Sequence, residues 1–209
     1  MGATESMLRY VPSIDTKSRT AAWDHTPPRS YRTKHATMRP GCVRDDGRDY
    51  CDRIARTLVL SAYHAAGEEC PPSGDDDARH LHMTSMYDAL YRMLPEDSKY
   101  ELVKVPSNSR AVAQCLSAGH LLCVALPVTE DVLDGDFHCP RPGTTPFALV
   151  PVIVKGYAMT SSVYTVDVPL GIYRESIKVG GKHLFDTRAC DYYTVVPPQS
   201  ELETPMFIP

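Results

Sequence analysis

The hydrophobic period of this chain changes once, from helical in its first part to alternating in its second. Helical spacing occupies residues 51–62, about 84–94 and 109–117. Alternation occupies residues 121–128, 147–157, 163–173 and 192–196. Because the helices precede the strands and do not alternate with them, the sequence predicts an α+β fold and argues against a parallel nucleotide-binding sheet.

The first predicted helix is the clearest element. Asp49 is a suitable N-cap and Gly67 a suitable stop. Its apolar face is an unbroken stripe made by Cys51, Ile54, Ala55, Leu58, Val59 and Ala62. The stripe predicts a helix that buries one side, with Cys51 as its first apolar residue.

The 209 residues suffice for one domain or two small lobes. We predict an N-terminal arm at 1–40, a helical lobe at 41–106, a β-barrel lobe at 107–196 and a C-terminal tail at 197–209. The arm and the tail are polar and rich in proline, so neither predicts a packed core of its own.

Charge and composition limit the classes of partner that the sequence predicts. A net charge of −4 gives no reason to expect nucleic acid, and no apolar run is long enough to span a membrane. Seven irregularly spaced cysteines without a secretory signal predict reduced thiols and a cytoplasmic protein. His80-Leu81-His82 lies in a polar loop and is a weak metal motif, so we expect no metal and no cofactor.

Five short segments, in this order, form a pattern. They are Tyr10-Val11-Pro12-Ser13-Ile14-Asp15, Val43-Arg44-Asp45-Asp46-Gly47 before Cys51, Ala118-Gly119-His120 before a strand, the strand 147–157 ending in Gly156-Tyr157, and Ala189-Cys190-Asp191-Tyr192-Tyr193-Thr194-Val195. Together they resemble the papain family of cysteine peptidases. The resemblance implies a two-lobed fold, with a central helix that begins near Cys51 and an antiparallel β-barrel-like lobe after it.

The departures from that family fall on its chemistry. The resemblance places Cys51 at the nucleophile position, Asp46 at the oxyanion glutamine, Val150 at the catalytic histidine and Val168 at the orienting asparagine. Valine has no proton to exchange, and an aspartate would repel the charge that an oxyanion hole stabilises, a contribution of about 3 kcal/mol. Loss of a triad base costs on the order of a million-fold in rate.

A thiolate at Cys51 would also face adverse charges. The helix N-terminus favours it, but Asp45, Asp46, Asp49 and Asp52 are only partly offset by nearby arginines. Among the eight histidines, His138 is the candidate for a recruited base, because it precedes the strand that would carry the histidine. Asp167 could orient an imidazole if one were present.

These residues support three hypotheses. The first is a papain-fold pseudo-peptidase that binds a peptide or protein partner in the cleft between its lobes. The second is an active peptidase that pairs Cys51 with a recruited base such as His138. The third is a structural or assembly protein. Only about ten residues precede Val11, so we expect no inhibitory prosegment, and with the degraded site this suggests a viral protein of the host cytoplasm or the virion.

Overall fold

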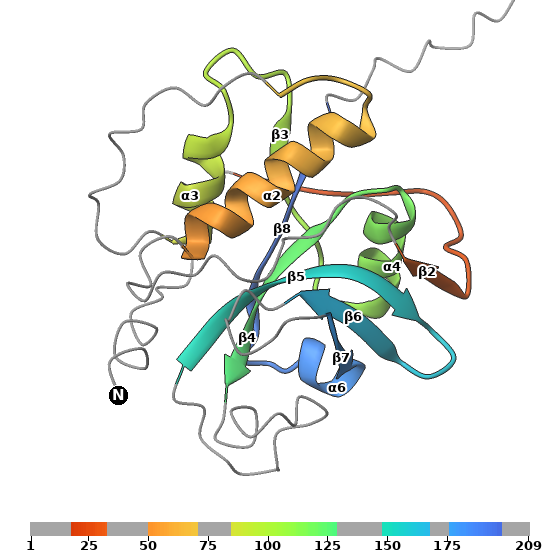
Figure 1. Cartoon of the computed structure of the whole chain (residues 1–209). Helices are drawn as coiled ribbons and strands as arrows, with labels where there is room; N and C mark the ends of the chain where they lie inside the picture. The colour runs from red at the N-terminus through yellow and green to blue at the C-terminus, as the bar shows by residue number, and fades with distance from the viewer. Residues whose placement is uncertain (1–17, 33–49, 71–84, 129–147, 168–175, 198–209) are drawn as a thin grey trace, which may run out of the picture.

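The computed structural model of the chain describes residues 18–32, 50–70, 85–128, 148–167 and 176–197 (Figure 1). Within these ranges, eight strands form one sheet, and four helices accompany it. The predicted α+β class is confirmed. None of the described helices is both long and apolar enough to cross a membrane.

Three helices form where the periodicity predicts them. α2 spans Tyr50–Ala65, α3 spans Met86–Met93 and α4 spans Ser109–Ser117. The turn after α2 contains Gly67, whose φ of 73° is the left-handed conformation that suits glycine. Ser85 caps α3 by accepting a hydrogen bond from the Asp88 N–H, and Asn108 caps α4 in the same way at Ala111.

The strands run in the order β1-β3-β8-β4-β5-β6-β7, and β2 pairs separately with β5. All pairs are antiparallel except β1 with β3. Their bounds are β1 Arg19–Thr20, β2 Ser30–Arg32, β3 Glu101–Lys104, β4 Leu122–Val128, β5 Ala148–Ala158, β6 Val163–Asp167, β7 Ile177–Gly180 and β8 Cys190–Val196. A short helix, α6, spans Gly181–Leu184.

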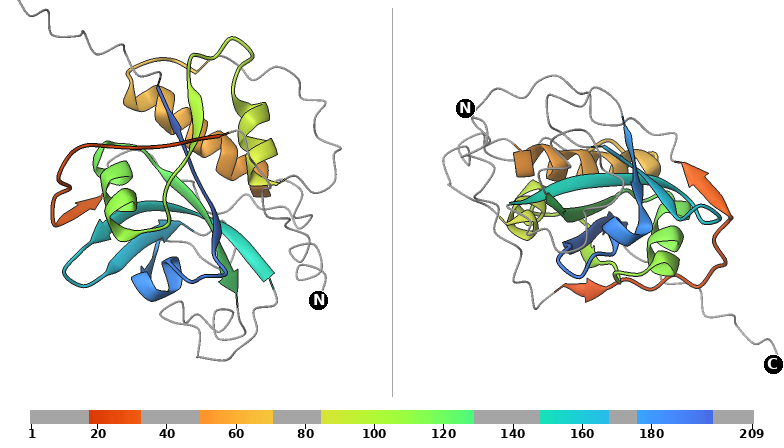
Figure 2. Two further views of the ribbon diagram at one scale, coloured as in Figure 1. Left: turned by 180° about the vertical axis from the view of Figure 1, so that it is seen from behind. Right: turned by 90° about the horizontal axis from the view of Figure 1, so that it is seen from below.

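The sheet has a hydrophobic cluster on each face. On one face, α2 and α3 pack over Cys123, Ile153 and Tyr193. On the other, α4 and Leu184 of α6 pack against the alternate residues of β4 and β5, including Val150 and Val152. Figure 2 shows α2 on one side of the sheet and α4 and α6 on the other. The two clusters follow from the alternation that the sequence shows, because successive strand residues point to opposite faces.

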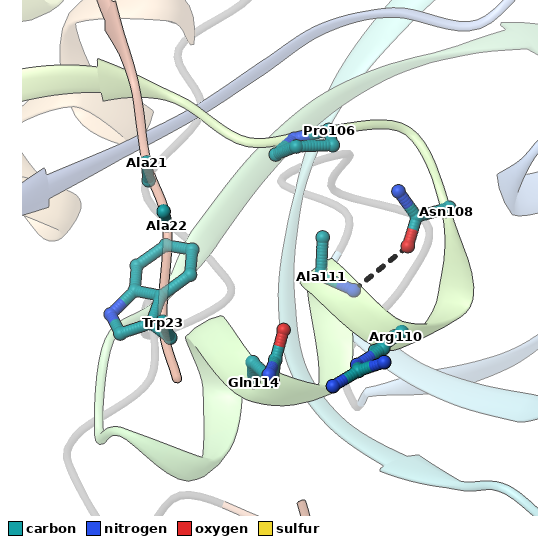
Figure 3. A pocket seen from close by; sticks show the side chains of 8 residues that line it. All are labelled: Ala21, Ala22, Trp23, Pro106, Asn108, Arg110, Ala111 and Gln114. Atoms are coloured by element: carbon teal, nitrogen blue, oxygen red, sulfur yellow. Dashed lines mark hydrogen bonds between the residues drawn. The ribbon is translucent and has the colours of Figure 1, made fainter. Parts of the chain in front are cut away.

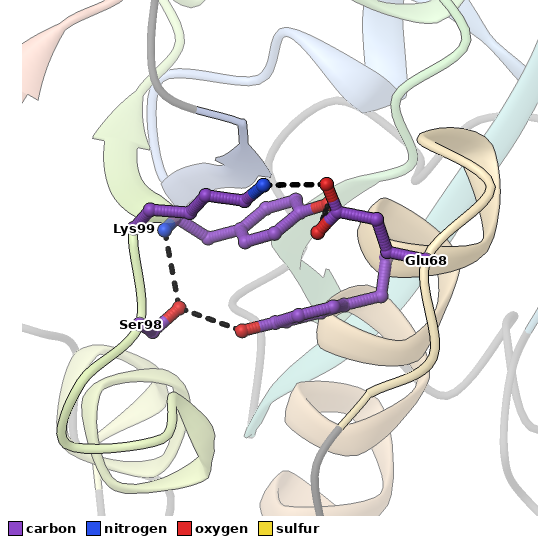
Figure 4. A network of polar contacts seen from close by, with 5 residues as sticks. Glu68, Ser98 and Lys99 are labelled. Carbon is purple, nitrogen blue, oxygen red and sulfur yellow. Dashed lines mark hydrogen bonds and ion pairs between the residues drawn. The ribbon is translucent and has the colours of Figure 1, made fainter.

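A polar network ties the end of α2 to the segment that enters β3 (Figure 4). The Tyr63 hydroxyl lies 2.8 Å from the Ser98 Oγ, and the Tyr100 hydroxyl donates to Glu68 at 3.2 Å. Lys99 also pairs with Glu68 and lowers the pKa of that carboxyl. The two tyrosine rings stack with centroids 3.9 Å apart. This network fixes the end of α2 that lies farthest from Cys51.

Candidate functional site

Cys51 is the second residue of α2 and its side chain is half-buried. It packs against the cluster between α2 and the sheet, so the helix holds it by the apolar stripe that the sequence predicts. As a first-turn residue it lies at the positive end of the helix dipole. The predicted position of the thiol on the helix is therefore confirmed.

The sheet brings two further thiols to the same region. Cys123 of β4 pairs with Tyr193, and Ala125 pairs with Cys190 of β8, so both cysteines lie on neighbouring strands. Cys123 is completely buried in the cluster that Cys51 packs against, and Cys190 is half-buried. No disulfide joins the five described cysteines to one another. The sequence contained each thiol but no sign of their convergence, because convergence depends on strand order.

These neighbours oppose ionisation. Burial, with the nearby Asp191, Cys51 and Cys190, raises the pKa of Cys123 well above its usual range. Burial and Asp191 raise the pKa of Cys190 to about 12. Both thiols are therefore protonated near neutral pH and cannot accept a proton from Cys51.

Asp191 itself has an uncommon backbone conformation. Its φ is 58°, in the left-handed region that aspartate tolerates better than most residues. The pairing of β4 with β8 shifts register between Cys123 and Ala125, beside this residue. The irregularity places a carboxylate, and not a cation, close to the buried thiols.

The first part of β5 offers no base. Val150 and Val152 point into the cluster on the α4 face, whereas Ile153 points into the cluster that Cys51 contacts. By alternation, Leu149 and Pro151 lie on the α2 face with Ile153. All seven residues from Ala148 to Val154 are apolar, so the strand lacks an ionisable side chain here whichever of them corresponds to the histidine position.

A bulge explains why the face of Val150 could not be assigned from sequence. The pairing of β5 with β6 shifts register between Val154 and Gly156, which leaves Lys155 as an extra residue. A single extra residue inverts the facing of everything before it. Counting back from Gly156 to Val150 crosses this bulge.

Asp167 forms an ion pair with Lys155, so its carboxylate does not serve to orient an imidazole. Its carboxylate lies 2.9 Å from the Lys155 Nζ, and the side chains are only 10% and 4% exposed. Sequence reasoning missed this pair. The available signal was a single lysine inside an otherwise apolar strand, since a buried ammonium requires a nearby anion.

The four described histidines have other environments. His25 lies 2.8 Å from the Ser117 Oγ of α4, His120 follows α4 directly, and His183 of α6 lies 3.0 Å from the Pro127 carbonyl oxygen. These three belong to the layer across the sheet from α2. His64 is in the last turn of α2, and a helix rise of 1.5 Å per residue puts it roughly 20 Å from Cys51.

The remaining predicted site residues, Asp46, Val168 and His138, lie outside the described residues. Among the residues that the structure does describe, no group of three or more histidine, cysteine, aspartate or glutamate side chains could hold a metal ion. The site as described thus consists of a helix-borne thiol, two protonated thiols, a carboxylate and an apolar strand.

Comparisons of the sequence and the structure with known proteins identify the fold. No protein-family model and no curated protein matches the sequence. The structure is similar to the crystal structure of xylellain, a cysteine protease from Xylella fastidiosa, with a TM-score of 0.58 over 91% of this chain and 96% of that one. The identity is 12%. The chain therefore has the α+β fold of a cysteine protease.

Proposed function

We propose that this protein is a papain-fold pseudo-peptidase, which binds an extended peptide or a protein partner between its lobes and does not cleave it. The observation that carries the proposal is the composition of the first part of β5. Every side chain from Ala148 to Val154 is apolar, on both faces of the strand.

The chemistry of cysteine peptidases explains why that composition matters. The thiol becomes a nucleophile only when its proton has somewhere to go and the thiolate is stabilised. The Asp191 carboxylate acts on Cys123, and Cys51 acts on the same thiol. A carboxylate in this region disfavours a second negative charge nearby. Asp46, at the oxyanion position by resemblance, would add the same repulsion.

Binding a peptide requires fewer chemical groups than cleaving it. A fold that presents strand edges and a helix along one groove can hold an extended peptide through backbone hydrogen bonds, with side-chain pockets for selectivity. Neither the backbone hydrogen bonds nor the side-chain pockets require the Cys51 thiol to ionise. We infer that Cys51 is retained because it completes the apolar face of α2, and that the partner is recognised by shape and backbone pairing.

Incubation with a pool of casein peptides tests this function. We expect mass spectrometry to recover every peptide intact, equally from the wild type and from Cys51→Ala, while labelled peptides from the pool bind both proteins in a saturable way. Cleavage that disappears in Cys51→Ala would overturn the proposal, and its loss in His138→Ala would identify the recruited base. Absence of both cleavage and binding would contradict peptide recognition and favour an assembly role.

A further inference from the structure

A pocket lies between residues 21–23 and α4 (Figure 3). Its volume is about 290 Å³, near the lower end of the range for small-molecule sites. It is lined by Ala21, Ala22, Trp23, Pro106, Asn108, Arg110, Ala111 and Gln114. Because α4 and α2 lie on opposite sides of the sheet, this pocket lies across the sheet from the helix that carries Cys51 (Figure 2).

Hydrogen bonds fix the walls of the pocket on both sides. The Ala21 N–H donates to the Lys104 carbonyl at 2.7 Å. Further along, the Gln114 Nε2 donates to the His25 carbonyl at 2.7 Å, and the His25 Nε2 lies 2.8 Å from the Ser117 Oγ. The segment is thus fastened before and after Trp23, so a ligand would meet a pocket that is already formed.

Gln114 presents an acceptor to the pocket. The residue is only 6% exposed, and its bond to His25 uses the amide nitrogen and so sets which end of the amide is the oxygen. Figure 3 shows the Oε1 pointing toward the pocket. An amide oxygen accepts hydrogen bonds, so a ligand N–H or O–H group in the pocket can bond to it.

The pocket is also positive. Arg110 is the only charged residue among those that line it, and its guanidinium extends back along α4 toward Gln114 (Figure 3). The first turn of α4 adds the positive end of its dipole, while Asn108 uses its Oδ1 to cap Ala111 at 2.9 Å. Guanidinium binds carboxylate through paired, charge-assisted hydrogen bonds.

We propose that this pocket binds a carboxylate whose α-carbon carries both an amide N–H and an apolar or aromatic side chain. Arg110 would pair with the carboxylate, the Gln114 Oε1 would accept from the amide, and Trp23 and Pro106 would cover the side chain. The chemistry is that of a peptide C-terminus or a free N-acyl amino acid. The proposal does not rest on the function proposed for the cleft.

Trp23 is the only tryptophan in the chain, so its fluorescence reports on this pocket directly. We expect N-acetylphenylalanine to change that fluorescence in a saturable way, and its carboxamide to bind at least about tenfold more weakly. The N-methylated amide should lose roughly three- to tenfold, because it has no N–H for Gln114. Equal affinity of the acid and the carboxamide, or no saturable change, would overturn the proposal.

Arg110→Gln should weaken binding of the acid by at least about tenfold and leave the carboxamide unchanged. The matched control is Arg92→Gln, which removes an exposed arginine from α3 and should change neither. Equal effects of the two variants would contradict the site. The tetrapeptide Ala-Ala-Ala-Phe identifies the source: tighter binding than N-acetylphenylalanine indicates a protein C-terminus, and weaker binding indicates a free N-acyl amino acid.

Discussion

Replacing Asp167 with alanine should lower the free energy of unfolding by about 3–5 kcal/mol, because it leaves the Lys155 ammonium buried without its anion. The pair lies within the sheet, where both side chains are almost fully covered. Urea unfolding, followed by circular dichroism, measures the loss.

Two further variants test whether the loss of stability comes from the unpaired buried charge. Glu101→Ala removes one partner of the exposed Arg19–Glu101 pair and should cost no more than about 1 kcal/mol. The double variant Lys155→Met with Asp167→Leu removes both charges and should come close to wild-type stability, since well-packed apolar residues often replace a buried pair without loss. A large loss in the double variant would show that the charges stabilise the sheet in some other way.

Leu58→Ala should cost about 2–5 kcal/mol, because Leu58 is 2% exposed and fills the space between α2 and the sheet. Leu60→Ala is the matched control on the same helix. Leu60 is 45% exposed, so its truncation should change stability by less than about 0.5 kcal/mol. The comparison isolates burial from helix propensity, since both substitutions replace leucine with alanine. Similar losses in the two variants would contradict the packing of α2 described here.

Periodicity predicted the long elements well. α4 coincides with the predicted 109–117, and β4, β5 and β8 begin or end within two residues of the predicted bounds. Their signals are strong because each long element buries one face. β3 was missed because Glu101–Lys104 holds only two apolar residues between two charged ones. β1, β2 and β7 were missed for a similar reason, since each is short and partly exposed.

The site was less predictable than the fold. The sequence located Cys51 on its helix because its apolar stripe begins there. It could not bring Cys123 and Cys190 to that region, since their proximity depends on β4 and β8 being neighbours. It also could not show which way Val150 faces, because the bulge at Lys155 inverts the strand. Long-range pairing and bulges leave little trace in a single sequence.

The rate at which iodoacetamide modifies Cys51 tests the central claim most directly, because alkylation requires the thiolate and not a substrate. The folded protein is treated at about pH 6 and then digested. Mass spectrometry of the peptides gives the modification rate of each cysteine. We predict that Cys51 reacts within about tenfold of Cys70, another half-buried thiol. Modification of Cys51 more than about a hundredfold faster than Cys70, abolished by His138→Ala, would contradict the proposal that this protein is a pseudo-peptidase.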